Sequence, residues 1–151
     1  MEAKQTFHLF TFARKNTLKE LDATSEAIAD KMAEGFSNNI RWNFGHIVTV
    51  TESIVCRLAG ATSELPGNYM TLFASGTSPK DWQGEVPSLK ELREQLEKQM
   101  ARIQNTFYDK LDNKTVEDFL GLETVRDAIL FAIYHEGMHL GTIKGLKKGL
   151  Q

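Results

Sequence analysis

Four stretches of this sequence repeat apolar residues at the three- and four-residue spacing of an amphipathic helix, and no stretch alternates as a strand would. They run from Phe7 to about Asp22, from Asn39 or Ile40 to about Ala59, from Ser88 to about Lys110 and from Thr124 to about Lys148. Each helix has one apolar face to bury, so the helices must pack against one another. The second and third are separated by a long connection, Gly60 to Pro87. The sequence therefore predicts an all-α fold, a four-helix bundle with a long connection between its second and third helices.

Capping residues support these boundaries. Ser37–Asn39 supplies N-cap residue types before the second helix, and Ser88-Leu89-Lys90-Glu91 is a capping box that begins the third. Inside the long connection, only Tyr69–Ala74 has the composition of a helical turn or two. The polar segment 22–39 allows one or two further turns, and segment 110–123 is predicted to contain a short turn around residues 116–119.

Composition limits the classes of partner and the location. The 151 residues can bury one core, and we expect a single domain over residues 1–151. A net charge of −2 gives no electrostatic reason to expect binding to nucleic acid or to an anionic membrane. We expect no signal peptide, since the first residues lack a basic segment followed by an apolar one, and no apolar run has membrane-spanning length. The single cysteine, Cys56, is predicted to be buried. A reducing cytoplasm is the expected location.

His135-Glu136-Gly137-Met138-His139 places two histidines one helical turn apart on the same face, where both imidazoles can reach a single metal ion. The segment also matches H-E-x-x-H, the helix of zinc metalloproteases. That class takes its third ligand from further along the chain. The twelve residues after His139 contain no His, Glu, Asp or Cys. The protease interpretation therefore fails for want of a third ligand.

A third ligand would have to come from upstream. His46 lies where the apolar stripe of the second helix meets polar residues, whereas His8 falls on the polar face of the first helix. We predict a metal site at His46, His135 and His139 that keeps open positions for water or substrate; the alternative is that they are hydrogen-bonded core histidines. Nitrogen ligands favour zinc or nickel first, with iron, cobalt and manganese as further candidates. Because metal ligands must be neutral, affinity is expected to fall below about pH 6.5.

Two segments resemble a known family. The Asn39–Ile47 segment, Asn-Ile-Arg-Trp-Asn-Phe-Gly-His-Ile, is similar to the "s-x-R-W-x-x-x-H-I" opening of the second helix in the DinB-like superfamily. The Tyr134–Ile143 segment resembles the "H-x-x-x-H-x-G-x-I" of its last helix. The resemblance implies a four-helix bundle, often a homodimer, with a divalent metal held by three histidines. His46, His135 and His139 match those ligand positions.

The resemblance also implies a range of functions. Relatives include metal-dependent S-transferases and isomerases that use bacillithiol, mycothiol or glutathione, and many members with no known reaction. We expect a metal-dependent enzyme of the thiol S-transferase, isomerase or hydrolase type that acts on a small-molecule substrate, with a low-molecular-weight thiol as candidate cosubstrate. The alternative is a non-catalytic metal-binding module in stress response or sensing. The sequence assigns no catalytic or cofactor-binding residue.

Three residues near the histidines have open roles. Glu136 is a candidate general base, but it projects about 100° round the helix from His135, so a surface or packing charge is the alternative. Asn43, one turn before His46, either orients an imidazole or is a surface amide. Trp42 is expected to form a wall of the site.

Glycines recur every fourth residue along the last helix, at Gly137, Gly141, Gly145 and Gly149. Each costs up to about 1 kcal/mol of helix stability relative to alanine, so the repeat indicates a compensating contact. We expect another helix to approach closely there, either the first helix of the same chain or one from a dimer mate.

Overall fold

The computed structural model describes all 151 residues, Met1–Gln151, and its only strand-like feature is an isolated bridge between Lys114 and Thr124. The helices are α1 (Ala3–Asp22), α2 (Glu26–Ala29), α3 (Ile40–Thr51), α4 (Tyr69–Phe73), α5 (Leu89–Phe107) and α6 (Val125–Gly149). A π-helical segment, η1 (Glu52–Arg57), continues α3, and a 3-10 turn, η2 (Pro79–Asp81), follows α4. None of the helices has the length and apolar character needed to cross a membrane. The all-α prediction is confirmed.

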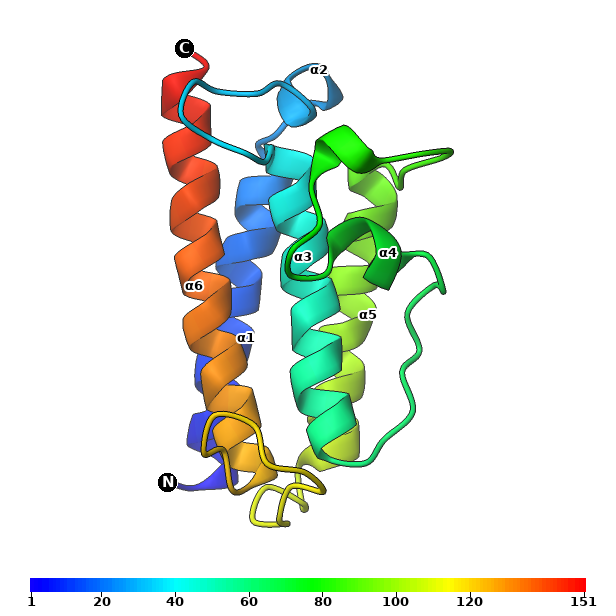
Figure 1. Cartoon of the computed structure of the whole chain (residues 1–151). Helices are drawn as coiled ribbons and strands as arrows, with labels where there is room; N and C mark the ends of the chain where they lie inside the picture. The colour runs from blue at the N-terminus through cyan, green and yellow to red at the C-terminus, as the bar shows by residue number, and fades with distance from the viewer.

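The four long helical segments, α1, α3 with η1, α5 and α6, lie side by side along the molecule (Figure 1). α1 and α6 run in the same direction, and α3 and α5 both run in the opposite direction (Figure 1). The chain between η1 and α5 must therefore return along the whole length of the molecule. α4 lies in the middle of this return and packs against α3.

The helix boundaries follow the capping residues. Ser88 and Glu91 exchange hydrogen bonds between side chain and backbone at the start of α5, and Thr124 and Asp127 do so at the start of α6. Asn39 caps α3 by accepting a hydrogen bond from the backbone N–H of Trp42 at 2.8 Å. α1 begins at Ala3 rather than Phe7, because a capping box formed by Glu2 and Gln5 starts the helix earlier. These pairs satisfy N–H groups that a helix start leaves unbonded.

Two local expectations are corrected. The second predicted helix widens from Glu52 to Arg57 into the π-helical η1, although it stops at Gly60 as expected, where the N–H groups of Gly60 and Ala61 donate to the carbonyls of Arg57 and Cys56 at 3.0 and 2.8 Å. The turn expected around residues 116–119 lies slightly later, at residues 119–122, where the N–H of Leu122 donates to the carbonyl of Phe119 at 3.0 Å. The N–H of Val116 bonds to the carbonyl of Leu58 at 2.9 Å, which ties this loop to the end of η1.

The glycine repeat of α6 does not pack against the first helix of the same chain, which was one of the two expected alternatives. A Cβ atom added at Gly137, Gly141 or Gly145 would have no atom of the chain within 4 Å, and at Gly149 it would meet only Ala33, at 3.4 Å. α1 therefore does not approach these glycines, which lie on an exposed face of α6.

A buried polar network crosses the apolar core. The guanidinium of Arg14 in α1 donates to both carboxylate oxygens of Glu136 in α6, at 2.8 and 3.1 Å, and to the Oε1 atom of Gln99 in α5 at 3.0 Å. The amide nitrogen of Gln99 donates to the carbonyl of Val48 and to Glu52, at 2.9 and 2.7 Å. Arg14, Gln99 and Glu136 have no exposed surface. The network therefore joins all four long helices at one level.

Cys56 is buried as predicted, with an exposed fraction of 2%. Burial, together with the nearby carboxylate of Glu52, raises the pKa of its thiol to about 11. The thiol is therefore protonated at neutral pH, and it packs in the apolar core.

Candidate metal centre

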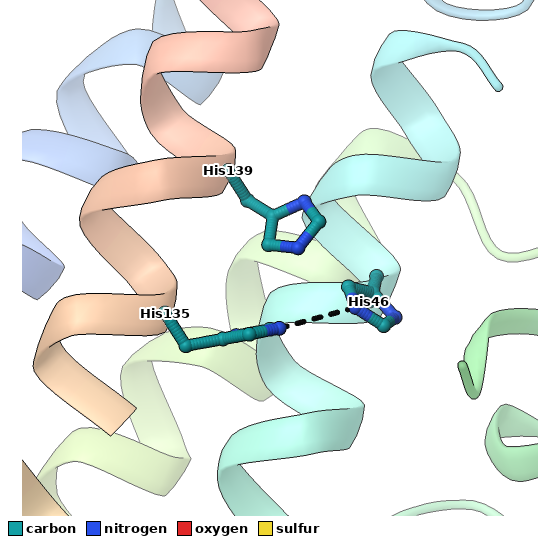
Figure 2. Close-up of side chains that lie close together, drawn as sticks. All are labelled: His46, His135 and His139. Carbon is teal, nitrogen blue, oxygen red and sulfur yellow. Dashed lines mark hydrogen bonds between the residues drawn. The ribbon is translucent and has the colours of Figure 1, made fainter. Parts of the chain in front are cut away.

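The imidazoles of His46, His135 and His139 point toward one another across the contact between α3 and α6 (Figure 2). Each contributes one ring nitrogen to a group whose members all lie within 4.8 Å of one another, and the Nε2 atoms of His46 and His135 are 3.1 Å apart. Two nitrogens bound to one tetrahedral zinc at about 2.0–2.1 Å would lie about 3.3 Å apart. The spacing therefore fits a shared ion. His8 is exposed on α1, as its polar face predicted.

The outer nitrogens of two of these rings are held by oxygen acceptors. Nδ1 of His46 donates to the carbonyl oxygen of Phe73 at 2.6 Å, and Nδ1 of His139 donates to Oδ1 of Asn43 at 2.8 Å. Because an oxygen acceptor requires the proton on Nδ1, the lone pair of each ring lies on Nε2, facing the cluster. Such outer hydrogen bonds orient the histidine ligands of metal sites.

Asn43 is itself fixed in the orientation that His139 needs. Its amide nitrogen donates to the carbonyl of Asn39 at 2.8 Å and to the side chain of Asn38 at 2.9 Å. The amide oxygen is therefore left facing His139. Of the two roles that the sequence left open, Asn43 has the orienting one.

Trp42 forms a wall of the cluster, as expected. Its ring stacks on that of His46 with centroids 4.3 Å apart and an angle of 14° between the planes. Its indole N–H donates to the hydroxyl of Thr77 at 2.9 Å, so the ring is fixed from both sides.

Phe73 is the functional residue that sequence reasoning missed, because it acts through its backbone carbonyl and any residue type has one. Its ring packs directly over Gly45, where a Cβ atom would overlap it. The close approach of α4 to α3 at this point brings the carbonyl of Phe73 to His46. A glycine immediately before the predicted ligand was the one available signal.

Replacing Gly45 with alanine should therefore lower both stability and metal affinity. Pushing the Phe73 ring away should cost about 1–3 kcal/mol of unfolding free energy and loosen the hydrogen bond to His46. Chemical denaturation and a metal titration measure the two effects. Gly137→Ala is the matched control, because that position is open and helical, and it should gain up to about 1 kcal/mol. Equal behaviour of the two variants would contradict this role for Gly45.

The folded protein keeps the three imidazoles neutral. Burial, and to a lesser extent the two neighbouring imidazoles, lowers the pKa of His135 to about 3. Burial and His46 lower the pKa of His139 to about 4. Burial also lowers the pKa of His46, although the carbonyl of Phe73 opposes this shift. Neutral imidazole is the form that binds metal.

These shifts revise the expected pH dependence. Metal affinity should hold below pH 6.5, because burial lowers the pKa of His46 and lowers the pKa values of His135 and His139 to about 3 and about 4. In the metal-free protein the unfolded state binds more protons than the folded state between about pH 6.5 and pH 4, so stability should decrease as pH falls through that range. Melting temperatures across this range, without metal, measure the effect. His135→Phe should flatten the profile and His8→Gln should not; identical profiles would contradict the assignment.

Glu136 is not a base at this site. Its carboxylate is fully buried, and both of its oxygens accept hydrogen bonds from Arg14. The general-base alternative is therefore wrong and the packing-charge alternative is confirmed. Its projection away from His135 follows from the 100° step between neighbouring residues on a helix.

A cavity of about 310 Å³ adjoins His135. Its walls come from α3, η1, α4 and α6 and from Phe119 in the loop before α6, and no Asp or Glu lines it. A larger hollow of about 1110 Å³ lies along α1 and α5, by His8 and Tyr108, and contains no residue of the histidine cluster. The smaller cavity is the one placed for a molecule that reaches the cluster.

Comparisons with known proteins identify the fold and the family. The conserved protein from Enterococcus faecalis has a similar fold, with a TM-score of 0.67 at 14% sequence identity, and the match covers 99% of this chain and 97% of that chain. No curated protein matches the sequence significantly. The family model described as the DinB superfamily matches residues 9–143, which include all three histidines of the cluster. The chain belongs to the DinB superfamily.

Proposed function

We propose that this protein is a four-helix bundle, formed by α1, α3 with η1, α5 and α6, that holds one divalent metal ion at His46, His135 and His139. The observation that carries the proposal is the convergence of three neutral imidazoles whose Nε2 atoms face one another, two of them oriented through Nδ1. Membership of the DinB superfamily is compatible with it. The all-nitrogen set favours zinc or nickel, then iron, cobalt or manganese, over magnesium or calcium.

We further propose that the site is catalytic and transfers a low-molecular-weight thiol to, or isomerises, a small molecule. When bound, an ion with three imidazole ligands keeps a position for water or thiolate and lowers the pKa of the group it binds. The cavity beside His135 supports a small-molecule substrate, because it is of a size used for such ligands. Its lining offers no carboxylate as a general base, which favours attack by an already deprotonated thiolate over base-assisted hydrolysis.

Two experiments test this function in sequence. Elemental analysis of the purified protein should find about one divalent transition metal ion per chain. The metal-loaded protein should then consume bacillithiol, mycothiol or glutathione in the presence of an electrophile such as 1-chloro-2,4-dinitrobenzene, and His139→Ala should not. Inactivity with all three thiols and each metal would favour the non-catalytic alternative, a metal-binding stress-response or sensing module.

We propose that the protein forms a homodimer through the exposed glycine face of α6. Gly137 and Gly141 leave this face open, and the neighbouring side chains of Tyr134 and Met138 are 64% and 48% exposed. An open, partly apolar helix face of this kind suits close packing against the same face of a second copy.

Gly141→Leu should therefore halve the mass in solution without unfolding the chain, since Gly141 is exposed and no atom of the chain lies within 4 Å of a Cβ atom added there. Light scattering coupled to gel filtration measures the mass, and thermal melting measures the fold. Lys98→Leu, exposed on α5, is the matched control and should leave the mass unchanged. If the Gly141→Leu variant is still a dimer in solution, the glycine face of α6 is not the dimer interface.

A further inference from the structure

The cavity beside His135 has a charged end away from the histidines. Arg57 lines it and is the only Lys, Arg, Asp or Glu that does so. We propose that this end binds the carboxylate of a small substrate with an apolar body, while the rest of that substrate lies toward His135. The inference rests on the proposed function, since it names the substrate class of the same site.

An unpaired buried hydroxyl lines the same cavity. Thr49 has no exposed surface, and its Oγ1 atom has no hydrogen-bond partner in the protein. The outer nitrogen of His135 is likewise buried without a partner. Buried polar atoms in native proteins are nearly always bonded, so unpaired ones beside a cavity indicate where a ligand donates or accepts. Thr51 also has an unpaired buried hydroxyl but does not line the cavity, which makes it a natural control.

Arg57 is available to a carboxylate. Its only ion-pair partner is Glu117, at 2.7 Å, and the two side chains are 48% and 43% exposed. An ion pair as exposed as this one stabilises a protein by only about 0–1 kcal/mol, so a ligand carboxylate can displace it at little cost. The guanidinium carbon lies over the Phe119 ring, 5.4 Å from its centre, in a cation–π contact at the cavity wall. A planar guanidinium binds a carboxylate through two parallel hydrogen bonds.

The π-helical segment η1 keeps Arg57 in line with the other polar groups of the cavity. Thr49, Ser53 and Arg57 all line it and follow one another at four-residue steps. In a continuous α-helix, eight residues would carry Arg57 about 80° round the axis from Thr49. The wider turn of η1, whose residues bond five apart, advances less per residue and offsets this drift.

The wall between Arg57 and His135 is aromatic. Phe119 and Phe131 meet edge to face with centroids 6.4 Å apart, and Phe131 stacks near the His135 ring, also at 6.4 Å. Rings of this kind contact flat or apolar groups and offer no hydrogen bonds. The cavity volume of about 310 Å³ lies at the small end of ligand sites, which span roughly 300–1,000 Å³. A small aromatic or aliphatic monocarboxylate fits this combination.

The test compares benzoate with its neutral isostere benzamide, and adds phenylacetate and hexanoate, by calorimetry on the zinc-loaded and metal-free protein. Benzoate should bind both forms and benzamide at least tenfold more weakly. Arg57→Gln should weaken benzoate at least tenfold and leave benzamide unchanged. Thr49→Val should weaken benzoate severalfold, whereas Thr51→Val and Arg93→Gln should match the parent protein.

Three outcomes would overturn the inference: equal binding of benzoate and benzamide, unchanged benzoate affinity in Arg57→Gln, or no binding of any of the three carboxylates. Benzoate that binds only the zinc-loaded protein, and equally well in Arg57→Gln, would be coordinating the ion. That result would be compatible with the metal site but would contradict the carboxylate subsite at Arg57. Arg57-dependent binding of benzoate to a protein that takes up no metal would support the subsite and contradict the metal site.

Discussion

Replacing His135 with alanine should reduce the metal content of the purified protein from about one divalent ion per chain to almost none. The same loss is expected for His46→Ala and His139→Ala, because each removes one of three converging Nε2 atoms and nothing nearby can replace it. Losing even an outer hydrogen-bond partner typically costs a metal site 10–100-fold in affinity, and losing a ligand costs more. Elemental analysis after zinc loading and dialysis measures the result.

A graded set of variants makes this prediction sharper. Asn43→Ala should retain the ion but bind it about 10–100-fold more weakly, since only the orientation of His139 is lost. His8→Ala, on the exposed face of α1, should bind like the parent protein. Full occupancy in the His46 variant would remove the three-histidine assignment, whatever the behaviour of the other two.

The second large effect is expected at the ion pair between Arg14 and Glu136. Both side chains are fully buried, so Glu136→Gln or Arg14→Met leaves its partner charged and only partly satisfied inside the core. Removing one partner of such a pair typically costs about 3–5 kcal/mol. For a domain of this size that corresponds to a fall in melting temperature of about 10 °C. Thermal and urea unfolding measure it.

The controls separate this structural role from a catalytic one. Arg14→Met combined with Glu136→Met should be less destabilised than the two single variants predict by addition, since no buried charge remains. Arg93→Met breaks the exposed pair with Asp22 and should change stability by less than about 1 kcal/mol. A Glu136→Gln protein with parental stability but abolished activity would restore the general-base interpretation.

Much of the site was predictable because it depends on short-range spacing. The four-residue step from His135 to His139 sets their shared face, and the polar border of the second helix marked His46. The starts of α3, α5 and α6 were predictable for the same reason, since a cap involves residues only three positions apart, whereas the capping box of Glu2 and Gln5 that starts α1 was missed.

The remainder depends on contacts that spacing cannot reveal. Periodicity showed that Glu136 points away from His135, but its partner Arg14 lies 122 positions earlier in the chain. The carbonyl of Phe73 reaches His46 only because the return connection folds onto α3 at Gly45. The glycine repeat of α6 gave no direction of approach, and the chain leaves that face open.

The widened turn η1 has a consequence for how this domain tolerates changes in length. Deleting one residue before Arg57 within Glu52–Arg57 would allow the helix to continue with ordinary α-helical bonding, and the seven remaining steps from Thr49 to Arg57 would turn through about 700°, within about 20° of two full turns. His46 precedes this segment and would keep its place opposite α6, and Arg57 would still face the same side as Thr49. The widened turn therefore lets this helix lose one residue while both ends of the cavity keep their orientation.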